Sequence, residues 1–278
     1  MTPTDPAARA QLASRTIEDF GRQWTRFQEN EGWYGSLDFL RDVCLPLVDP
    51  SELQGARVAE VGSGTGRIVR MLLEAGSSHV FAVEPSDAME VLLRNVADVR
   101  DRVTPLRVRG DALPEGLGLD WVFSIGVLHH VPDPDPVVAA IHAALRPGGR
   151  VLVWLYGHEG NGLYLALARP LRAVTTRLPE RALLACTAAL DRGLDAYRWL
   201  CRKAPAVLPL PLRGYLLRVL DPLSREQRRL VIYDQLNPAY ARYYREAEAR
   251  DLLERGGFRN VRLHHRHGYS WTVTGEKP

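Results

Sequence analysis

The most informative stretch of this chain is Val58-Ala-Glu60-Val-Gly62-Ser-Gly64-Thr-Gly66-Arg67. A short apolar strand ends there in three glycines, and a helical pattern begins directly after them. Glycine lets the backbone approach a ligand closely, and the N-terminus of the following helix carries partial positive charge. Alone, the GxGxG spacing is a weak signal, because many tight turns have it and nicotinamide enzymes carry GxGxxG in the same place. The neighbouring segments must therefore decide what this loop binds.

Outward from this loop, strand and helix patterns alternate. Strands are expected at 57–61, 79–83, 103–109, 120–124 and 150–156, and helices at 66–74, 87–96 and 136–145. This alternation predicts an α/β fold, with a doubly wound parallel sheet and helices on both faces. After a helix at 246–254, strands at 261–265 and 270–274 are too close together for a crossover, so they must be antiparallel. The sheet should therefore end in an antiparallel hairpin.

The remaining segments suggest two helical additions. Residues 11–31 form an amphipathic pattern that we expect to be helical and broken at Gly21, and a short helix follows at 36–48. We divide the chain into an N-terminal helical lid (1–50), a core (51–156 and 246–278) and a helical cap insertion for the acceptor (157–245). The insertion is punctuated by prolines, Pro170 among them, with helical stretches such as 181–190 and 215–220 between them.

Two carboxylates follow the second and third expected strands. Glu84 can accept hydrogen bonds from both hydroxyls of an adenosine ribose, and Asp111 can accept one from an adenine amino group while the Ala112 amide meets a ring nitrogen. Both lie where open α/β sheets bind ligands, at the carboxyl ends of strands. A surface charge at Glu84 and a capping role for Asp111 are the structural alternatives.

With these residues the chain resembles the class I S-adenosylmethionine-dependent methyltransferases. It is similar in particular to the small-molecule branch that includes ubiquinone-biosynthesis-type and methyltransferase type 11 enzymes. The matching strings span about 55–156 in the expected order: Val58–Gly66, Val83-Glu-Pro-Ser86, Gly110-Asp-Ala-Leu113, Ser124-Ile-Gly-Val-Leu-His-His-Val-Pro-Asp133 and Leu145-Arg-Pro-Gly-Gly149. Glu60 departs from the family, where aspartate is commoner, but the carboxylate is kept.

The resemblance implies a Rossmann-like core with S-adenosylmethionine as cofactor. It implies that Glu60 and the loop of Gly62, Ser63, Gly64 and Gly66 hold the methionine portion. It places the ribose on Glu84. The further residues that it implies at the cofactor are Pro85, Ser86, Asp111 and Ala112 around the adenine, and Ser124 and Gly126 near the amino-acid end. No metal is expected; His264, His265 and His267 lack a fitting geometry on a strand.

Three histidines are the candidate catalytic residues. His129 and His130 follow the fourth strand, beside the expected methyl position, and neutral imidazole suits proton transfer near pH 7. One of them could instead merely support the loop. His158 follows the fifth strand on the same rim and is a candidate for substrate contact. Trp24, on the N-terminal helix, either covers the cofactor as part of a lid or belongs to a helix that packs on the sheet.

Charge and composition limit the partners. The 278 residues carry a net charge of +3, which is too balanced to argue for nucleic acid. Residues 157–240 hold 13 basic and 7 acidic residues, so arginines such as Arg169, Arg172, Arg177 and Arg181 could attract an anionic or lipid-linked acceptor, or be solvated helix faces. Three scattered cysteines, no signal pattern and no long apolar run predict a cytoplasmic protein without a transmembrane segment. A homo-oligomer stays open.

We therefore predict methyl transfer from S-adenosylmethionine to a small molecule in secondary or specialised metabolism, with oxygen favoured and carbon or nitrogen open as the methylated atom. One alternative is a methyltransferase that acts on RNA or protein, which would want a broad basic groove. A nicotinamide enzyme is disfavoured by GxGxG and by the terminal hairpin. A non-catalytic cofactor-binding partner subunit remains the alternative from another class.

Overall fold

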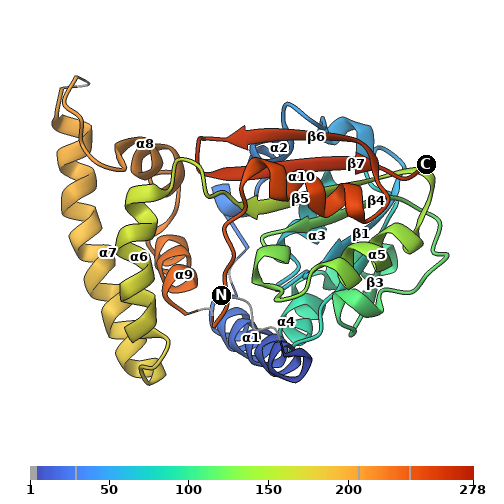
Figure 1. The fold of residues 1–278 in the computed structure, drawn as a ribbon, viewed down its shortest axis with the longest axis horizontal. Helices are drawn as coiled ribbons and strands as arrows, with labels where there is room; N and C mark the ends of the chain where they lie inside the picture. Colours follow the sequence, from blue (N-terminus) through green and yellow to red (C-terminus); the bar gives the residue numbers. More distant parts are fainter. Residues whose placement is uncertain (1–4, 29, 206, 238) are drawn as a thin grey trace. The chain divides into compact units, whose positions relative to one another are not determined.

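Seven strands form one sheet in the order β3-β2-β1-β4-β5-β7-β6 in the computed structural model, which describes residues 5–28, 30–205, 207–237 and 239–278 (Figure 1). The strands are β1 Arg57–Val61, β2 His79–Val83, β3 Val103–Leu106, β4 Leu119–Ile125, β5 Leu145–Tyr156, β6 Arg259–Arg266 and β7 Ser270–Glu276. The first five run parallel, whereas β7 pairs antiparallel with both β5 and β6. The predicted doubly wound sheet with a terminal antiparallel hairpin is confirmed.

The chain forms two compact units. The core unit comprises Met1–Asn30, Gly35–Gly160 and Ala239–Pro278, and the helical unit comprises Glu31–Tyr34 and Asn161–Pro238. The core unit contains α1 Pro6–Arg26, α2 Leu37–Cys44, α3 Arg67–Glu74, α4 Ala88–Asn95, α5 Asp135–Ala144 and α10 Glu246–Arg255. The helical unit contains α6 Gly162–Thr175, α7 Glu180–Lys203, α8 Arg213–Tyr215 and α9 Arg225–Leu236, with a π-helical turn at Leu216–Leu220.

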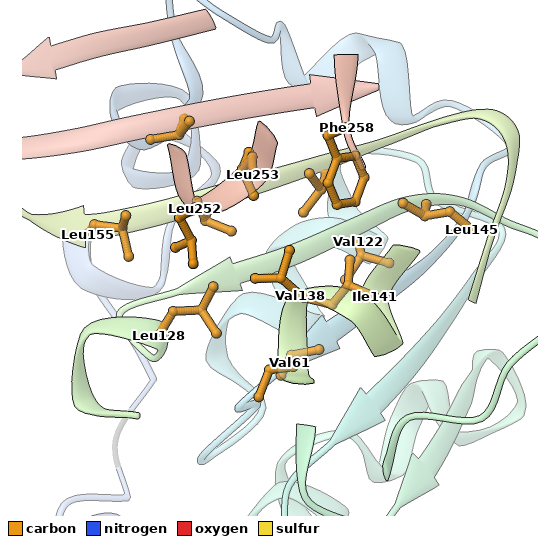
Figure 2. Packing of buried hydrophobic residues seen from close by; sticks show 14 of the residues in the cluster. Val61, Val122, Leu128, Val138, Ile141, Leu145, Leu155, Leu252, Leu253 and Phe258 are labelled. Carbon is orange, nitrogen blue, oxygen red and sulfur yellow. The ribbon is translucent and has the colours of Figure 1, made fainter. Parts of the chain in front are cut away.

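Apolar side chains cover both faces of the sheet. On one face, α5 and α10 pack against the strands, and Figure 2 shows Ile141 and Leu252 among the side chains that fill this layer. On the other face, α2, α3 and α4 supply a second buried cluster that includes Leu72 and Leu92. Alternate residues of one strand serve the two layers, because successive side chains point to opposite faces. This packing fixes the carboxyl ends of the strands, where the loops of the site begin.

The first helix begins and ends about five residues earlier than the expected 11–31, and it runs through Gly21 without a break. Its start is set by Asp5, whose side chain accepts hydrogen bonds from the backbone N–H groups of Ala7 and Ala8, and by Pro6 in the first turn. The expected break was therefore wrong. A Cβ at Gly21 would lie 2.9 Å from Cβ of Ser86, so glycine here permits close packing and does not end the helix.

Helices of the helical unit are longer than the sequence indicated. Proline was expected to punctuate this region, yet α6 continues past Pro170, and α7 extends well beyond the expected 181–190. Within this unit α9 packs against α7 and α6 (Figure 1). A capping box starts α9, in which the Ser224 side chain accepts from the Gln227 N–H and the Gln227 side chain accepts from the Ser224 N–H. Tertiary packing therefore overrides the local cost of proline.

In the part of the chain that the structure describes, no helix is long and apolar enough to cross a membrane.

Candidate functional site

The glycine loop joins β1 to α3 in a conformation that requires glycine. Gly62, Gly64 and Gly66 have φ angles of +83°, +49° and +80°. L-residues that carry a side chain rarely adopt positive φ angles. A Cβ at Gly62 would also lie 2.3 Å from a methyl carbon of Val127. The N–H groups of Gly62 and Ser63 both donate to the Val83 carbonyl, at 2.8 and 3.0 Å. The loop is therefore held against β2, and its remaining backbone lies at the N-terminus of α3.

Glu84 ties the glycine loop to the turn that follows β2. It is buried, and its Oε2 accepts from the Gly64 N–H at 2.9 Å. Its Oε1 accepts from the Ser86 N–H at 2.9 Å and from the Ser86 hydroxyl at 2.5 Å. A carboxylate offers about four acceptor positions, so these three bonds leave room for one further donor. Glu84 thus organises the loop as well as being available to a ligand hydroxyl, and Pro85 holds the turn between it and Ser86.

Glu60, at the end of β1 beside the glycine loop, is a buried acidic residue with a carboxyl oxygen that lacks a hydrogen-bond donor in the described part of the chain. It is 1% exposed at the end of β1, and among the described residues its Oε2 has no hydrogen-bond partner. Burial raises the pKa of this carboxyl group from an ordinary value of 4.5 to about 8, although the Arg67 charge opposes the shift. A buried acceptor without a donor is costly. The structure therefore has an unmet demand for a hydrogen-bond donor, or a cation, beside the glycine loop.

Two loops at the carboxyl ends of the strands contact α1. The Trp24 indole lies against Gly64, whose Cβ position is 3.3 Å from the indole nitrogen. The Phe20 ring is 4.7 Å from the His130 ring between centroids. Near the start of the helix, an ion pair of 2.9 Å joins Arg9 to Asp133. One face of α1 therefore covers the glycine loop and the loop that follows β4.

Two asparagines that no sequence motif marked hold the glycine loop from outside. Asn30 donates to the Thr65 carbonyl at 3.0 Å and accepts from the Thr65 hydroxyl at 2.6 Å. Asn95, at the end of α4, donates to the same carbonyl at 2.9 Å. They lie about 30 residues from Thr65 on either side, so no local spacing could have indicated them.

The turn Gly110–Ala112 brings Asp111 and Ala112 to the same edge of the sheet. A Cβ at Gly110 would lie 2.8 Å from a methyl carbon of Val61, so this turn is pressed against the end of β1. Both Asp111 and Ala112 are exposed, and Asp111 forms a bidentate ion pair with Arg109 at 2.7 and 3.1 Å. Arg109 would therefore compete with any ligand amino group for the Asp111 carboxylate.

The turn Leu128–His130 places both expected histidines inside the protein. The Nδ1 atom of His130 lies 2.8 Å from the Tyr240 carbonyl oxygen. Because a carbonyl can only accept, Nδ1 carries the hydrogen, and in the neutral ring the basic lone pair is on Nε2. The two imidazoles are 4.3 Å apart between centroids. The segment that contains Tyr240 thus selects the tautomer of His130.

Aromatic rings continue from His129 across the end of β5. Its imidazole stacks on Tyr156 at 3.7 Å, and Tyr156 stacks on Tyr243 at 5.3 Å. The Arg242 N–H donates to the His129 carbonyl at 2.8 Å, which fixes the backbone of this turn. Tyr156 is the last residue of β5, and Tyr243 lies shortly before α10. The structure brings them together with His129 in one stack.

The other predicted site residues lie at the ends of β4 and β5. Ser124 is buried, and its hydroxyl donates to the Val61 carbonyl at 3.3 Å. Gly126 has a φ of +84°, and its N–H donates to the Trp154 carbonyl. The His158 backbone N–H donates to the Tyr244 carbonyl at 2.8 Å, and its side chain is half-buried.

Two of the three histidines near the C-terminus contact residues outside the predicted site. His265 stacks on Trp271 at 4.3 Å, and His267 lies 2.8 Å from an Asp42 carboxylate oxygen. Over the described residues, no group of three or more His, Cys, Asp or Glu side chains is gathered as a metal site would need.

Comparison with known proteins places this geometry in a family. Residues 59–151 match the family model described as a methyltransferase domain. The core unit carries a methyltransferase domain. The resemblance to class I S-adenosylmethionine-dependent methyltransferases is thereby confirmed, and S-adenosylmethionine is the cofactor of this class.

Curated relatives match the core of this chain in sequence. A tRNA U34 carboxymethyltransferase of Pseudoalteromonas translucida is 33% identical over 128 residues, which are 45% of this chain and 38% of that protein. A ubiquinone biosynthesis O-methyltransferase of Neisseria meningitidis serogroup C is 27% identical over 142 residues, which are 49% of this chain and 59% of that protein. The chain thus spans less than two thirds of the length of these relatives.

Solved structures share this fold over almost the whole length of the chain. The 1,6-didemethyltoxoflavin-N1-methyltransferase of Burkholderia thailandensis has a TM-score of 0.56 and 17% identity, covering 99% of this chain and 92% of its own. Magnesium protoporphyrin IX methyltransferase of Synechocystis has a TM-score of 0.55 and 14% identity, covering 97% and 99%. At these identities the likeness concerns the fold alone.

Proposed function

We propose that this protein transfers the methyl group of S-adenosylmethionine to a small-molecule acceptor. The observation that carries the proposal is the buried carboxyl of Glu60, whose Oε2 lacks a hydrogen-bond partner among the described residues, next to the glycine loop. A cofactor with a cationic amino group beside a nucleoside meets this demand. The residues present therefore fit S-adenosylmethionine, whose sulfonium supplies an already activated methyl group when it is bound.

Each residue of the site has a proposed task in this reaction. Glu60 and the loop residues Gly62, Ser63, Gly64 and Gly66 hold the methionine portion. Glu84 accepts from a ribose hydroxyl with its remaining acceptor position, and Trp24 covers the loop and excludes water. The remaining proposed contacts are Pro85, Ser86, Asp111 and Ala112 at the adenine, and Ser124 and Gly126 at the amino-acid end.

His130 is the proposed general base. The Tyr240 carbonyl orients its ring and holds the hydrogen on Nδ1, so that Nε2 is the basic nitrogen. Such an orienting hydrogen bond is what a general base needs in order to take a proton from an acceptor hydroxyl. His129, which stacks on Tyr156, supports the turn and shapes the acceptor side, and His158 contributes substrate contact from the end of β5.

Replacing His130 tests this assignment. His130→Ala should lower kcat by roughly 100-fold or more if the acceptor must lose a proton. The limb of the kcat–pH profile that reports the base should disappear, while the affinity for S-adenosylhomocysteine stays unchanged. His129→Ala is the comparison, since it removes a neighbouring imidazole of the same turn. An unchanged pH profile in His130→Ala would remove His130 from the proton transfer.

Oxygen is our first choice for the methylated atom, with carbon or nitrogen as the alternatives, and the acceptor class that we propose belongs to specialised metabolism. A tRNA acceptor is the second candidate, because tRNA U34 carboxymethyltransferases are among the curated relatives. An acceptor in protein, or a role as a non-catalytic cofactor-binding subunit, would use the same fold. These alternatives differ in what the protein binds besides the cofactor.

Calorimetric titration with S-adenosylmethionine, S-adenosylhomocysteine and NAD is the first experiment. We expect micromolar binding of the first two and none of NAD. A panel of hydroxylated and amino-substituted small molecules, and bulk tRNA, would then be screened for S-adenosylhomocysteine release. Turnover with tRNA alone would favour the second candidate, and binding without any turnover would favour the non-catalytic role. No binding of either sulfur compound would overturn the proposal.

A further inference from the structure

An apolar stripe runs along the solvent-facing side of α6 in the helical unit. Leu163, Leu167, Leu171 and Val174 recur at spacings of four, four and three residues, which places them on one face of the helix. Their exposed fractions are 51%, 60%, 41% and 60%. A helix on the surface of a soluble protein normally turns such a face inward and its polar face outward.

The opposite side of α6 holds the polar contacts. The Arg172 guanidinium donates to the Gln235 carbonyl at 2.9 Å, and the Thr175 hydroxyl donates to the Leu236 carbonyl at 2.9 Å. The Tyr164 hydroxyl bonds the Gln235 side chain. The helix is thus fixed to α9 through hydrogen bonds and buries Leu165, while Leu163, Leu167 and Leu171 stay exposed.

Charge along this segment has a single sign. From residue 160 to residue 179 the sequence contains three arginines and no aspartate or glutamate. Arg169 is exposed on α6, and Arg177 is exposed just beyond the C-terminal end of the helix. Apolar residues flanked by arginine, without acidic residues, are typical of helices that lie on anionic lipid.

We propose that α6 docks the protein on an anionic phospholipid surface. The helix has 14 residues, whereas about 20 are needed to span a bilayer, so it would lie in the plane of the interface. The four apolar side chains of the stripe would enter the boundary between headgroups and acyl chains, and Arg169 and Arg177 would meet the lipid phosphates. This inference does not depend on the proposed methyl transfer.

Co-sedimentation of the whole protein with vesicles tests the proposal. One set of vesicles is neutral phosphatidylcholine, and in the other a third of the lipid is phosphatidylglycerol. We expect binding to the anionic vesicles that exceeds binding to the neutral ones and weakens in high salt, because salt screens the arginine–phosphate attraction. Failure to bind anionic vesicles, or equal binding to both sets, would overturn the proposal.

Two matched variants assign the binding to α6. The double variant Leu167→Gln/Leu171→Gln should raise the lipid concentration for half-maximal binding by about tenfold or more, since burial of two leucines is lost. Leu190→Gln makes the same change at a leucine of α7 that is 37% exposed, and it should leave the lipid concentration for half-maximal binding unchanged. An equal rise of the half-maximal lipid concentration in both variants would show that the binding does not depend on α6.

Two further measurements keep the outcomes separate. Amide hydrogen exchange of α7 and α9, measured on every variant, should stay at the wild-type rate, which shows that the helical unit is folded. Light scattering without lipid tests whether the stripe instead joins two copies of the chain. If the protein forms a concentration-dependent dimer and Leu167→Gln/Leu171→Gln abolishes it, the stripe binds a second copy of the chain and the lipid proposal is wrong.

Discussion

At the scale of single residues, the site depends on carboxylates that differ in how fully they are satisfied. Glu84 accepts three hydrogen bonds from the Gly64 and Ser86 groups around it, whereas Glu60 is buried with an oxygen that no described residue satisfies. The same residue type therefore organises the loop in one place and holds unused binding capacity in the other. The strings of sequence around them could not show this difference, because it depends on which donors the fold brings near each oxygen.

Glu60 should make stability depend on pH. Its pKa is about 8 in the folded protein and near 4.5 when unfolded, so between these values only the folded state keeps the proton. Stability should then fall as pH rises from 5 to 8, since the unfolded state binds fewer protons. Glu60→Gln, which cannot lose a proton, should remove on the order of 3 kcal/mol of this decline.

Urea unfolding at pH 5 and pH 8 measures this effect. Glu74→Gln, at the exposed end of α3, is the control and should decline with pH as the wild type does. Identical declines in all three proteins would contradict the assignment of the raised pKa to Glu60.

At the scale of elements, the structure gives α1 a position that the sequence left open. It covers the loops at the carboxyl ends of β1 and β4, where Trp24 meets Gly64 and Phe20 meets His130. The helical periodicity of residues 11–31 was enough to predict the helix. It could not place the helix, because the face that becomes buried is the same for a lid and for a helix packed on the sheet.

Gly21 is where this docking can be tested. Alanine normally stabilises a helix by about 1 kcal/mol relative to glycine. Gly21→Ala should lack this gain, because its Cβ would be 2.9 Å from Cβ of Ser86, and displacement of α1 should weaken S-adenosylhomocysteine binding by about tenfold, or about 1.4 kcal/mol.

The matched control for this change is Gly193→Ala on α7. There a Cβ meets nothing within 4 Å, so alanine should stabilise its own helix and leave cofactor affinity unchanged. Amide hydrogen exchange of α1 and α7 reports both effects. Slower exchange of α1 in Gly21→Ala would show that the contact with Ser86 is not tight.

At the scale of the whole molecule, all residues proposed for cofactor contact belong to the core unit. The helical unit has its own basis of stability, in which buried Asp191 of α7 pairs with Arg225, Arg228 and Arg229 of α9 at 3.2 to 3.4 Å. A buried carboxylate between arginines is costly to remove, since the guanidinium groups then lose their counter-charge.

Asp191→Ala should therefore destabilise the helical unit by about 2–3 kcal/mol, a figure reduced from that of fully buried pairs because two of the arginines are partly exposed. Amide exchange of α7 and α9 should accelerate, while cofactor affinity stays at the wild-type value. Glu226→Ala, at an exposed position of α9, should change neither quantity by more than about 0.5 kcal/mol. A fall in cofactor affinity in Asp191→Ala alone would show that the core unit depends on the helical unit.

The sequence by itself determined the doubly wound sheet and its reversed last strand, and its motifs carried the resemblance to methyltransferases. These follow from local patterns: apolar periodicity, glycine at positions of positive φ and motifs in fixed order along residues 55–156. Local signals were less reliable where proline or glycine stood inside a helix, as at Pro170 and Gly21, because packing against other elements offset the local cost.

Only the tertiary structure decided how the side chains of the site are engaged. It brought Tyr240 to His130, Tyr243 to Tyr156, and Asn30 to Thr65, pairs that lie far apart along the chain. It also turned Leu163, Leu167 and Leu171 of α6 outward, although their spacing alone is typical of a buried face. Such contacts depend on distances between elements, and periodicity within one element contains no information about those distances.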